Sequence, residues 1–308
     1  MHTPARSTTQ DIHLRNAPSI PDGGDPTLHI LTQTLENLLF EVPYTSISQF
    51  YKVFENQTPP ERFGVSCVWQ SYLLGDRLRE AGLDCKQTYL NDRRHIALLC
   101  TQGRRRFLLD PYLLHRVPIE LSTDGEEHER RRFEVPAYPN RRDDVGTTRS
   151  AKLVVDAHDT NINLLYTRYS PERRHAVIAR AFNLNTENQA GNKPPEGDFL
   201  KPLLYHGEQN NLSIRVILRD TLEMSELIYP IALLHGQPVQ RNHLLVRNNQ
   251  GQFIRADEAG FPEAMVRMGD SLGCTADDLE TFVLDGVNIY ERHAPVHIDY
   301  APYRIRND

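Results

Sequence analysis

The sequence of 308 residues lacks the features that mark several large classes of protein. It has no apolar run of 18 residues, and its first ten residues, MHTPARSTTQ, lack the apolar core of a signal peptide. Neither a membrane-spanning segment nor secretion is therefore expected. Lysine and arginine number 35 against 41 aspartates and glutamates, and this net charge of −6 argues against a nucleic-acid partner.

Cysteine is also scarce, with four residues in the whole chain and no pattern of paired Cys or His of the kind that binds zinc. This scarcity predicts reduced thiols, a cytoplasmic protein and no bound metal. Cys85, Cys100 and Cys274 are predicted to be small buried hydrophobes, the commonest role of a lone cysteine.

The composition that remains, 39% hydrophobic and 25% charged, is ordinary for a globular protein, and the length allows two or three lobes. Apolar periodicity predicts helices at 26–40, 46–54, 261–272 and 275–287, and strands at 150–158, 161–170, 212–218 and 225–234, the last ambiguous with a buried helix. A further hairpin is predicted within 243–257. The charged stretch 118–148 is interpreted as a solvated face and 172–201 as largely irregular. The fold class is therefore predicted to be α+β.

A helix that begins at a cysteine is the first candidate functional feature. Residues at spacings of three or four place one face of this helix at Cys67, Ser71, Leu74, Leu78 and Ala81. Ser66 is a good N-cap and Gly82 a good stop. Cys67 would then lie in the first turn, where free N–H groups and the helix dipole favour a thiolate and can hold an oxyanion.

The second feature is a predicted β-hairpin formed by HIALLC and RRFLLD. A two-residue loop at Gln102-Gly103 would set His95 directly opposite Asp110, with Cβ atoms about 4.5–5.5 Å apart. A slip of one residue would put the two side chains on opposite faces of the sheet. Taken singly, His95 could be a core histidine and Asp110-Pro111 an ordinary turn, but the order Cys67, His95, Asp110 favours a nucleophilic site.

This stretch resembles the arylamine N-acetyltransferases, in which a cysteine opens a helix, a histidine lies in an H-x-x-L-L strand and an aspartate follows in the next strand. The matching residues are Cys67, His95 and Asp110. The stretch is also similar to the transglutaminase-like thiol enzymes, in which proline typically follows the aspartate, as Pro111 does here.

The sequence departs from the R-G-G-x-C-x-E-x-N pattern of the acetyltransferases, with Val65 for a glycine and Trp69 and Ser71 for the Glu and Asn. The resemblance implies an N-terminal helical lobe, a central antiparallel sheet or barrel and a C-terminal α/β lid. We accordingly predict a flexible arm at 1–24, a helical lobe carrying the nucleophile at 25–90, a β lobe carrying His95 and Asp110 at 91–205, and a lid at 206–308.

The function that the resemblance implies is acyl transfer through an acyl-cysteine. The donor would be an acyl thioester, either acyl-CoA or an acyl-carrier protein, the acceptor an amine and the product an amide, with no permanently bound cofactor. The alternatives are a transglutaminase-like or peptidase-like enzyme acting on protein or peptide amides, and a binding protein with a vestigial site. Trp69 and Tyr112 lie near the site in sequence and are candidates to line the substrate pocket, although core packing is the commoner role of such aromatics.

Overall fold

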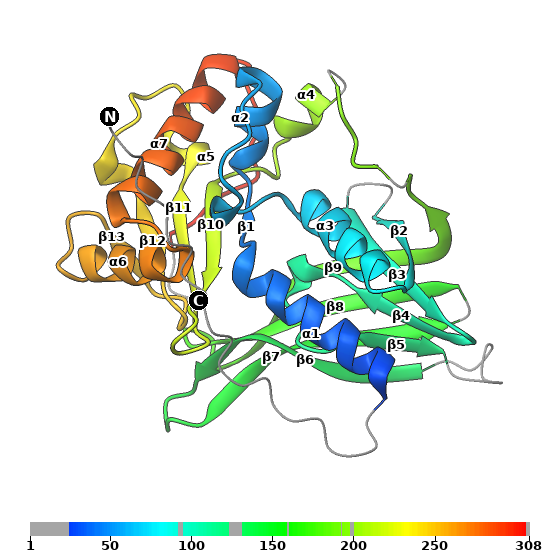
Figure 1. The fold of residues 1–308 in the computed structure, drawn as a ribbon. Helices are drawn as coiled ribbons and strands as arrows, with labels where there is room; N and C mark the ends of the chain where they lie inside the picture. Colours follow the sequence, from blue (N-terminus) through cyan, green and yellow to red (C-terminus); the bar gives the residue numbers. More distant parts are fainter. Residues whose placement is uncertain are drawn as a thin grey trace, which may run out of the picture.

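The computed structural model describes residues 25–91, 95–122, 131–158, 160–191, 193–197 and 200–305. The arm predicted at 1–24 lies outside these residues. The described part is a mixed α+β structure with two antiparallel sheets, drawn in Figure 1. The predicted fold class is confirmed at this level.

The larger sheet has eight strands in the order β5-β4-β3-β2-β9-β8-β7-β6. Their bounds are β2 (Asp84–Leu90), β3 (His95–Gln102), β4 (Arg105–Leu109), β5 (Ile119–Ser122), β6 (Arg131–Arg142), β7 (Thr148–His158), β8 (Asn161–Ser170) and β9 (His175–Gln189). Every neighbouring pair is antiparallel. The sheet is curled and nearly closed like a barrel, because an isolated bridge joins His115 to Ala137 of the edge strand β6. Apolar side chains from its strands fill the interior.

The smaller sheet has the order β1-β10-β11-β12-β13. Its strands are β1 (Tyr44–Thr45), β10 (Leu212–Ile217), β11 (Met224–Tyr229), β12 (Leu245–Arg247) and β13 (Phe253–Arg255). The short strand β1 comes from the N-terminal part of the chain and pairs with β10. The N-terminal segment is therefore tied to the C-terminal sheet, a long-range pairing that no local pattern indicates.

Helices cover both sheets. They are α1 (Pro26–Glu41), α2 (Ser48–Glu55), α3 (Cys67–Glu80), α4 (Leu200–Leu204), α5 (Ile231–Leu234), α6 (Gly260–Leu272) and α7 (Ala276–His293), with 3-10 turns η1 (Glu61–Phe63), η2 (Pro111–Leu113) and η3 (Arg241–His243). Helices α1 and α3 lie side by side and share a core with β2, β3 and β4 (Figure 1). Helices α2, α6 and α7 pack with the smaller sheet around a second core.

The helix ends follow the sequence signals. Asp25 caps α1 by accepting a hydrogen bond from the Thr27 amide at 2.9 Å, and Pro26 is the first helical residue. A capping box begins α7, with the Thr275 hydroxyl accepting from the Asp278 amide and the Asp278 carboxylate accepting from the Thr275 amide. The predictions for these two starts are confirmed.

Two regions differ from the sequence prediction. The stretch expected to be irregular holds β9, and the charged stretch expected to be a solvated face holds β5 and β6. Both misassigned regions are polar, and their side chains are often half-exposed or exposed, so their apolar alternation is weak. Each strand buries only a few apolar residues, among them Ile119, Val135 and Leu184, and hydrogen bonds to neighbouring strands hold it in the sheet.

The cysteines are a further correction. The structure joins Cys85 and Cys100 in a disulfide, so the prediction of reduced thiols is wrong for this pair. The two residues are direct partners in the β2–β3 register, which places their side chains together on one face of the sheet. The cytoplasmic location was predicted from reduced thiols, and the disulfide removes that argument. Cys67 and Cys274 are free and half-buried.

Candidate active site

The first element of the candidate site is the start of α3. Cys67 is its first residue, as predicted, and Ser66 is the N-cap residue. The Ser66 side chain makes no capping hydrogen bond, and its hydroxyl is buried without a partner among the described residues. The first-turn N–H groups are therefore not taken by a capping side chain, which leaves them available to an oxyanion formed at Cys67.

The segment before the nucleophile is held by a close backbone contact. The Val65 amide donates to the Pro43 carbonyl at 3.1 Å, and the Thr45 amide donates to the Val65 carbonyl at 3.0 Å. Gly64 has a φ of +81°, and a Cβ at this position would lie 1.9 Å from the Pro43 oxygen. Only glycine fits there, so Gly64 sets how closely the chain before Cys67 approaches β1.

The second element is the pair His95 and Asp110. The His95 Nε2 lies 2.8 Å from Asp110 Oδ2, and both side chains are buried. Burial lowers the pKa of His95, but Asp110 and Cys67 outweigh it, and the pKa is raised well above its usual value. The Cys67 thiol therefore lies close to the His95 ring. Because Nε2 is bonded to Asp110, Nδ1 is the nitrogen left for the thiol. The structure thus brings Cys67, His95 and Asp110 together.

The hairpin register differs from the predicted one by two residues. The two-residue loop is Gly103-Arg104, since Gln102 pairs with Arg105. Gly103 has a φ of +60°, and glycine at the first loop position is what a type II′ turn requires. A slip of two keeps both side chains on one face of the sheet, so Asp110 meets His95 as a diagonal neighbour instead of a direct one. The expected contact forms although the expected register does not.

The orientation of Asp110 depends on the turn that follows β4. Its Oδ1 accepts from the Tyr112 amide at 3.1 Å, while its own backbone amide donates to His115 Nε2 at 2.8 Å. His115 is fully buried and its Nδ1 donates to the Val117 carbonyl at 2.7 Å. Burial lowers the pKa of His115, so this ring is neutral and accepts at Nε2. His115 is a positioning residue that sequence reasoning missed, because its role depends on this local turn.

Ser71 fixes the helix to the strand. Its buried hydroxyl donates to the Ile96 carbonyl at 2.7 Å, next to His95 in β3. Ser71 lies one helical turn after Cys67, so the bond limits the movement of the thiol relative to the imidazole. The sequence places Ser71 on the same helix face as Cys67, but the hydrogen bond to β3 could not be inferred from it.

The two predicted substrate-wall aromatics lie in different places. The Tyr112 ring lies 5.2 Å from the His95 ring and 6.4 Å from that of Phe182. Trp69 is half-buried under the Lys52 ammonium, 3.5 Å from the ring centroid. Residues two apart on a helix do not share a face, so Trp69 is directed away from the side that carries Cys67. Phe182, whose ring is 4.9 Å from His95, is an aromatic neighbour that the sequence did not indicate.

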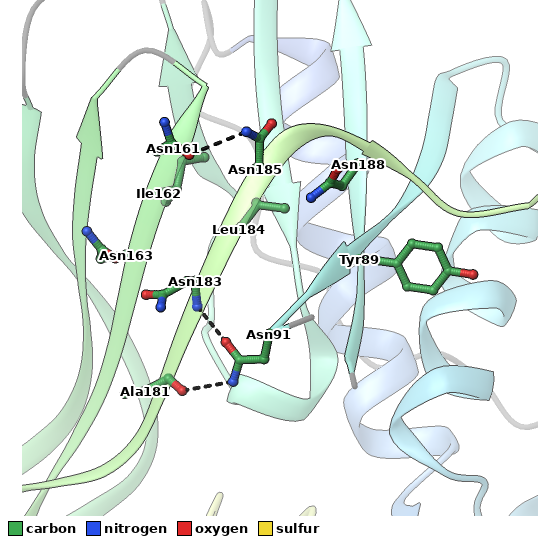
Figure 2. A pocket seen from close by; sticks show the side chains of 10 residues that line it. All are labelled: Tyr89, Asn91, Asn161, Ile162, Asn163, Ala181, Asn183, Leu184, Asn185 and Asn188. Atoms are coloured by element: carbon green, nitrogen blue, oxygen red, sulfur yellow. Dashed lines mark hydrogen bonds between the residues drawn. The ribbon is translucent and has the colours of Figure 1, made fainter. Parts of the chain in front are cut away.

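A groove of about 760 Å³ is lined by residues of β2, β8 and β9 and by Asn91 (Figure 2). Its lining includes several asparagines, such as Asn91, Asn163 and Asn183, and none of the three residues of the triad. Side chains alternate between the faces of a strand, so Asn183 of β9 lines this groove while the adjacent Phe182 lies against His95. The groove is thus separate from the triad.

No family model matches the chain, and no curated protein matches it. In the described ranges, no helix is long and apolar enough to cross a membrane. Across the same residues, no three His, Cys, Asp or Glu side chains gather closely enough to hold a metal ion. The geometry of the site itself therefore carries the functional argument.

Proposed function

We propose that the protein is an N-acyltransferase that moves an acyl group from an acyl thioester, through an acyl-cysteine at Cys67, to an amine. The observation that carries this proposal is the buried bond of 2.8 Å between His95 and Asp110, with the Cys67 thiol close enough to the same imidazole to raise its pKa. In the finer architecture that we propose, the helices, the barrel and the C-terminal sheet are arranged as in the arylamine N-acetyltransferases.

In the first half-reaction His95 takes the proton of Cys67, and Asp110 stabilises the resulting imidazolium. The thiolate attacks the thioester carbonyl, and N–H groups of the first turn of α3 hold the oxyanion. A new carbon–sulfur bond forms, the bond to the donor thiol breaks, and the departing thiolate takes the proton from His95.

In the second half-reaction the amine attacks the acyl-cysteine carbonyl and gives a proton to His95. The amide bond forms as the bond to Cys67 breaks, and the proton returns to the sulfur. Transfer rather than hydrolysis requires that water be kept from the acyl-cysteine while the amine enters. The burial of His95 and Asp110 supports such exclusion.

Mass spectrometry of the intact protein with a panel of acyl-CoA and acyl-carrier-protein thioesters tests the proposal. We expect one added acyl mass, absent in Cys67→Ala and retained in Cys274→Ala, the matched control at the other free cysteine. Addition of an amine should release the acyl group as an amide. Acylation only from glutamine or peptide amides would replace the proposal with a transglutaminase-like activity, and no acylation from any donor would favour a vestigial site.

A further inference from the structure

Two arginines lie on the aromatic wall beside the triad. The Arg180 guanidinium carbon is 4.4 Å from the centroid of the Tyr112 ring, and that of Arg215 is 5.4 Å from the same ring. The Arg215 carbon is also 5.0 Å from the Tyr44 ring, and the two tyrosine rings are 4.9 Å apart. Since the Tyr112 ring is also 5.2 Å from His95, one ring separates the imidazole from both cations. Arg180 and Arg215 are called the guanidinium pair below.

Tyr44, which lies beside Tyr112 and Arg215, is also close to the nucleophile Cys67. Burial raises the pKa of Tyr44 well above its usual value, and the nearby Tyr112 and Cys67 raise it further. Arg215 and Arg180 act on the same phenol in the opposite direction. Tyr44 is therefore close enough to the thiol and to the guanidinium pair to respond to all three. Tyr44, Tyr112, Cys67 and Arg180 are each half-buried, so part of each residue is exposed to solvent.

Around the guanidinium pair, the arginines outnumber the carboxylate that they share. Glu226 is 5% exposed, accepts from Arg247 Nη2 at 2.5 Å and from Ser213 Oγ at 3.0 Å, and lies 3.8 Å from Arg215 Nη2. Burial raises the pKa of Glu226, but Arg247, Arg215 and Arg180 outweigh it and bring the pKa to about 2. One carboxylate thus serves three arginines. Burying an unbalanced charge is costly, which favours binding of a further anion.

One guanidinium also has an unused donor. Arg215 is only 4% exposed, and its Nη1 is buried without a hydrogen-bond partner among the described residues. Among the described residues, Arg180 also has no ion pair within 4 Å, and its guanidinium lies on the Tyr112 ring. Such donors are well suited to a carboxylate, which accepts two N–H groups from a guanidinium.

We propose that the guanidinium pair binds the carboxylate of a substrate and makes the enzyme selective for anionic substrates. This inference rests on the proposed function for the identity of the reaction, but not for the existence of the anion site. The carboxylate can belong to the acyl donor or to the amine acceptor, since both must reach Cys67 in turn.

Alkylation of Cys67 tests the anion site without any substrate. Iodoacetate and iodoacetamide attack the same thiol with nearly the same shape and differ in one negative charge. We expect the iodoacetate-to-iodoacetamide rate ratio for Cys67 to exceed that of glutathione by about tenfold, as one charge-assisted hydrogen bond implies. The excess should disappear in Arg180→Gln and shrink as potassium chloride is added. Arg149→Gln, which loses the same charge on the exposed side of β7, is the control and should keep the excess.

If the arginines only supported the thiolate, both reagents would slow equally in Arg180→Gln, and the equal slowing would overturn the proposal. A wild-type ratio equal to that of glutathione would overturn it too. Arg180 is chosen because it is half-buried, whereas removal of the buried Arg215 risks misfolding. Circular dichroism and an unchanged melting temperature identify a folded variant.

Paired substrates then identify which partner carries the charge. Succinyl-CoA against butyryl-CoA compares donors, and glycine against glycinamide compares acceptors. A kcat/KM preference for the anionic member of one pair, lost in Arg180→Gln, assigns the carboxylate to that substrate. The iodoacetate preference without acyl transfer from any thioester would refute the proposed function and leave the anion site standing, while acyl transfer without either preference would refute the anion site alone.

Discussion

Two groups of side chains, the His95–Asp110 pair and the arginines around Glu226, contribute to the same site in opposite electrostatic ways. From the eight-stranded sheet and the turn after β4 come His95 and Asp110, a buried pair in which each charge has a partner at 2.8 Å. The five-stranded sheet supplies Arg215, Arg247 and Glu226, and Arg180 joins them from β9 of the larger sheet, so three arginines share the single carboxylate of Glu226. The His95–Asp110 pair is balanced in charge and suited to proton transfer, and we call it the complete side. The arginines around Glu226 form the incomplete side, because an added negative charge is needed to balance them.

The largest expected effect is on the complete side. Asp110→Asn keeps the shape of the side chain but removes the charge that supports the imidazolium. We expect acyl transfer to fall by about 10⁴-fold, as in other triads. The iodoacetate-to-iodoacetamide ratio should stay unchanged, because the guanidinium pair is untouched. Single-turnover acylation followed by mass spectrometry measures the first quantity. Near wild-type acylation would remove Asp110 from the triad.

Gly64 sets how closely the chain before Cys67 approaches β1, and β1 pairs with β10 of the smaller sheet. A substitution at Gly64 tests this contact. Alanine there places a Cβ 1.9 Å from the Pro43 oxygen and keeps an unfavourable φ of +81°. We expect the free energy of unfolding to fall by roughly 4 kcal/mol or more. Gly82→Ala is the matched control, since its φ is +84° but a Cβ there meets nothing within 4 Å. Urea unfolding of both variants measures the difference, and equal losses would show that the approach to Pro43 is not tight.

On the incomplete side, lowering the pH tests the charge of Glu226. The pKa of Glu226 is about 2 in the folded protein against an ordinary 4.5, so its ionisation stabilises the fold above pH 4.5 and this contribution is lost as the pH falls toward 2. The shift corresponds to about 3 kcal/mol. In Glu226→Gln the fall in unfolding free energy between pH 5 and pH 2 should be smaller by about that amount. Glu134→Gln, an exposed carboxylate beside Lys152, should leave the fall unchanged.

The smallest effect on the site is expected from the disulfide of the eight-stranded sheet. The bond closes a loop with a sequence separation of 15, for which chain entropy predicts about 3 kcal/mol of stabilisation. Cys85→Ala with Cys100→Ala should lower the unfolding free energy by about this amount while both alkylation rates at Cys67 stay the same. Thiol titration of the denatured wild type should find two thiols before reduction and four after it, and four thiols before reduction would contradict the pairing.

Local patterns were enough for the elements that carry the nucleophile and its partners. The start of α3 at Cys67, the strand beginning at His95 and the turn at Asp110 follow from caps, apolar runs and a proline. These signals act over a few residues, so they survive without knowledge of the rest of the fold. The predicted β3–β4 register differs from the observed one by two residues, because Gly103 can form a two-residue loop either with Gln102 or with Arg104.

The sequence by itself determined the α+β character, the helix with Cys67 in its first turn, and a hairpin able to place an imidazole beside a carboxylate. Only the tertiary structure decided the position of β9, the Cys85–Cys100 bond and the support of Asp110 by His115. It also decided the meeting of Arg180, from β9, with Arg215, from β10, on one aromatic wall. These contacts join residues whose own neighbourhoods in sequence do not require them, and they form because closure of one sheet and pairing of β1 with β10 bring distant segments into one space.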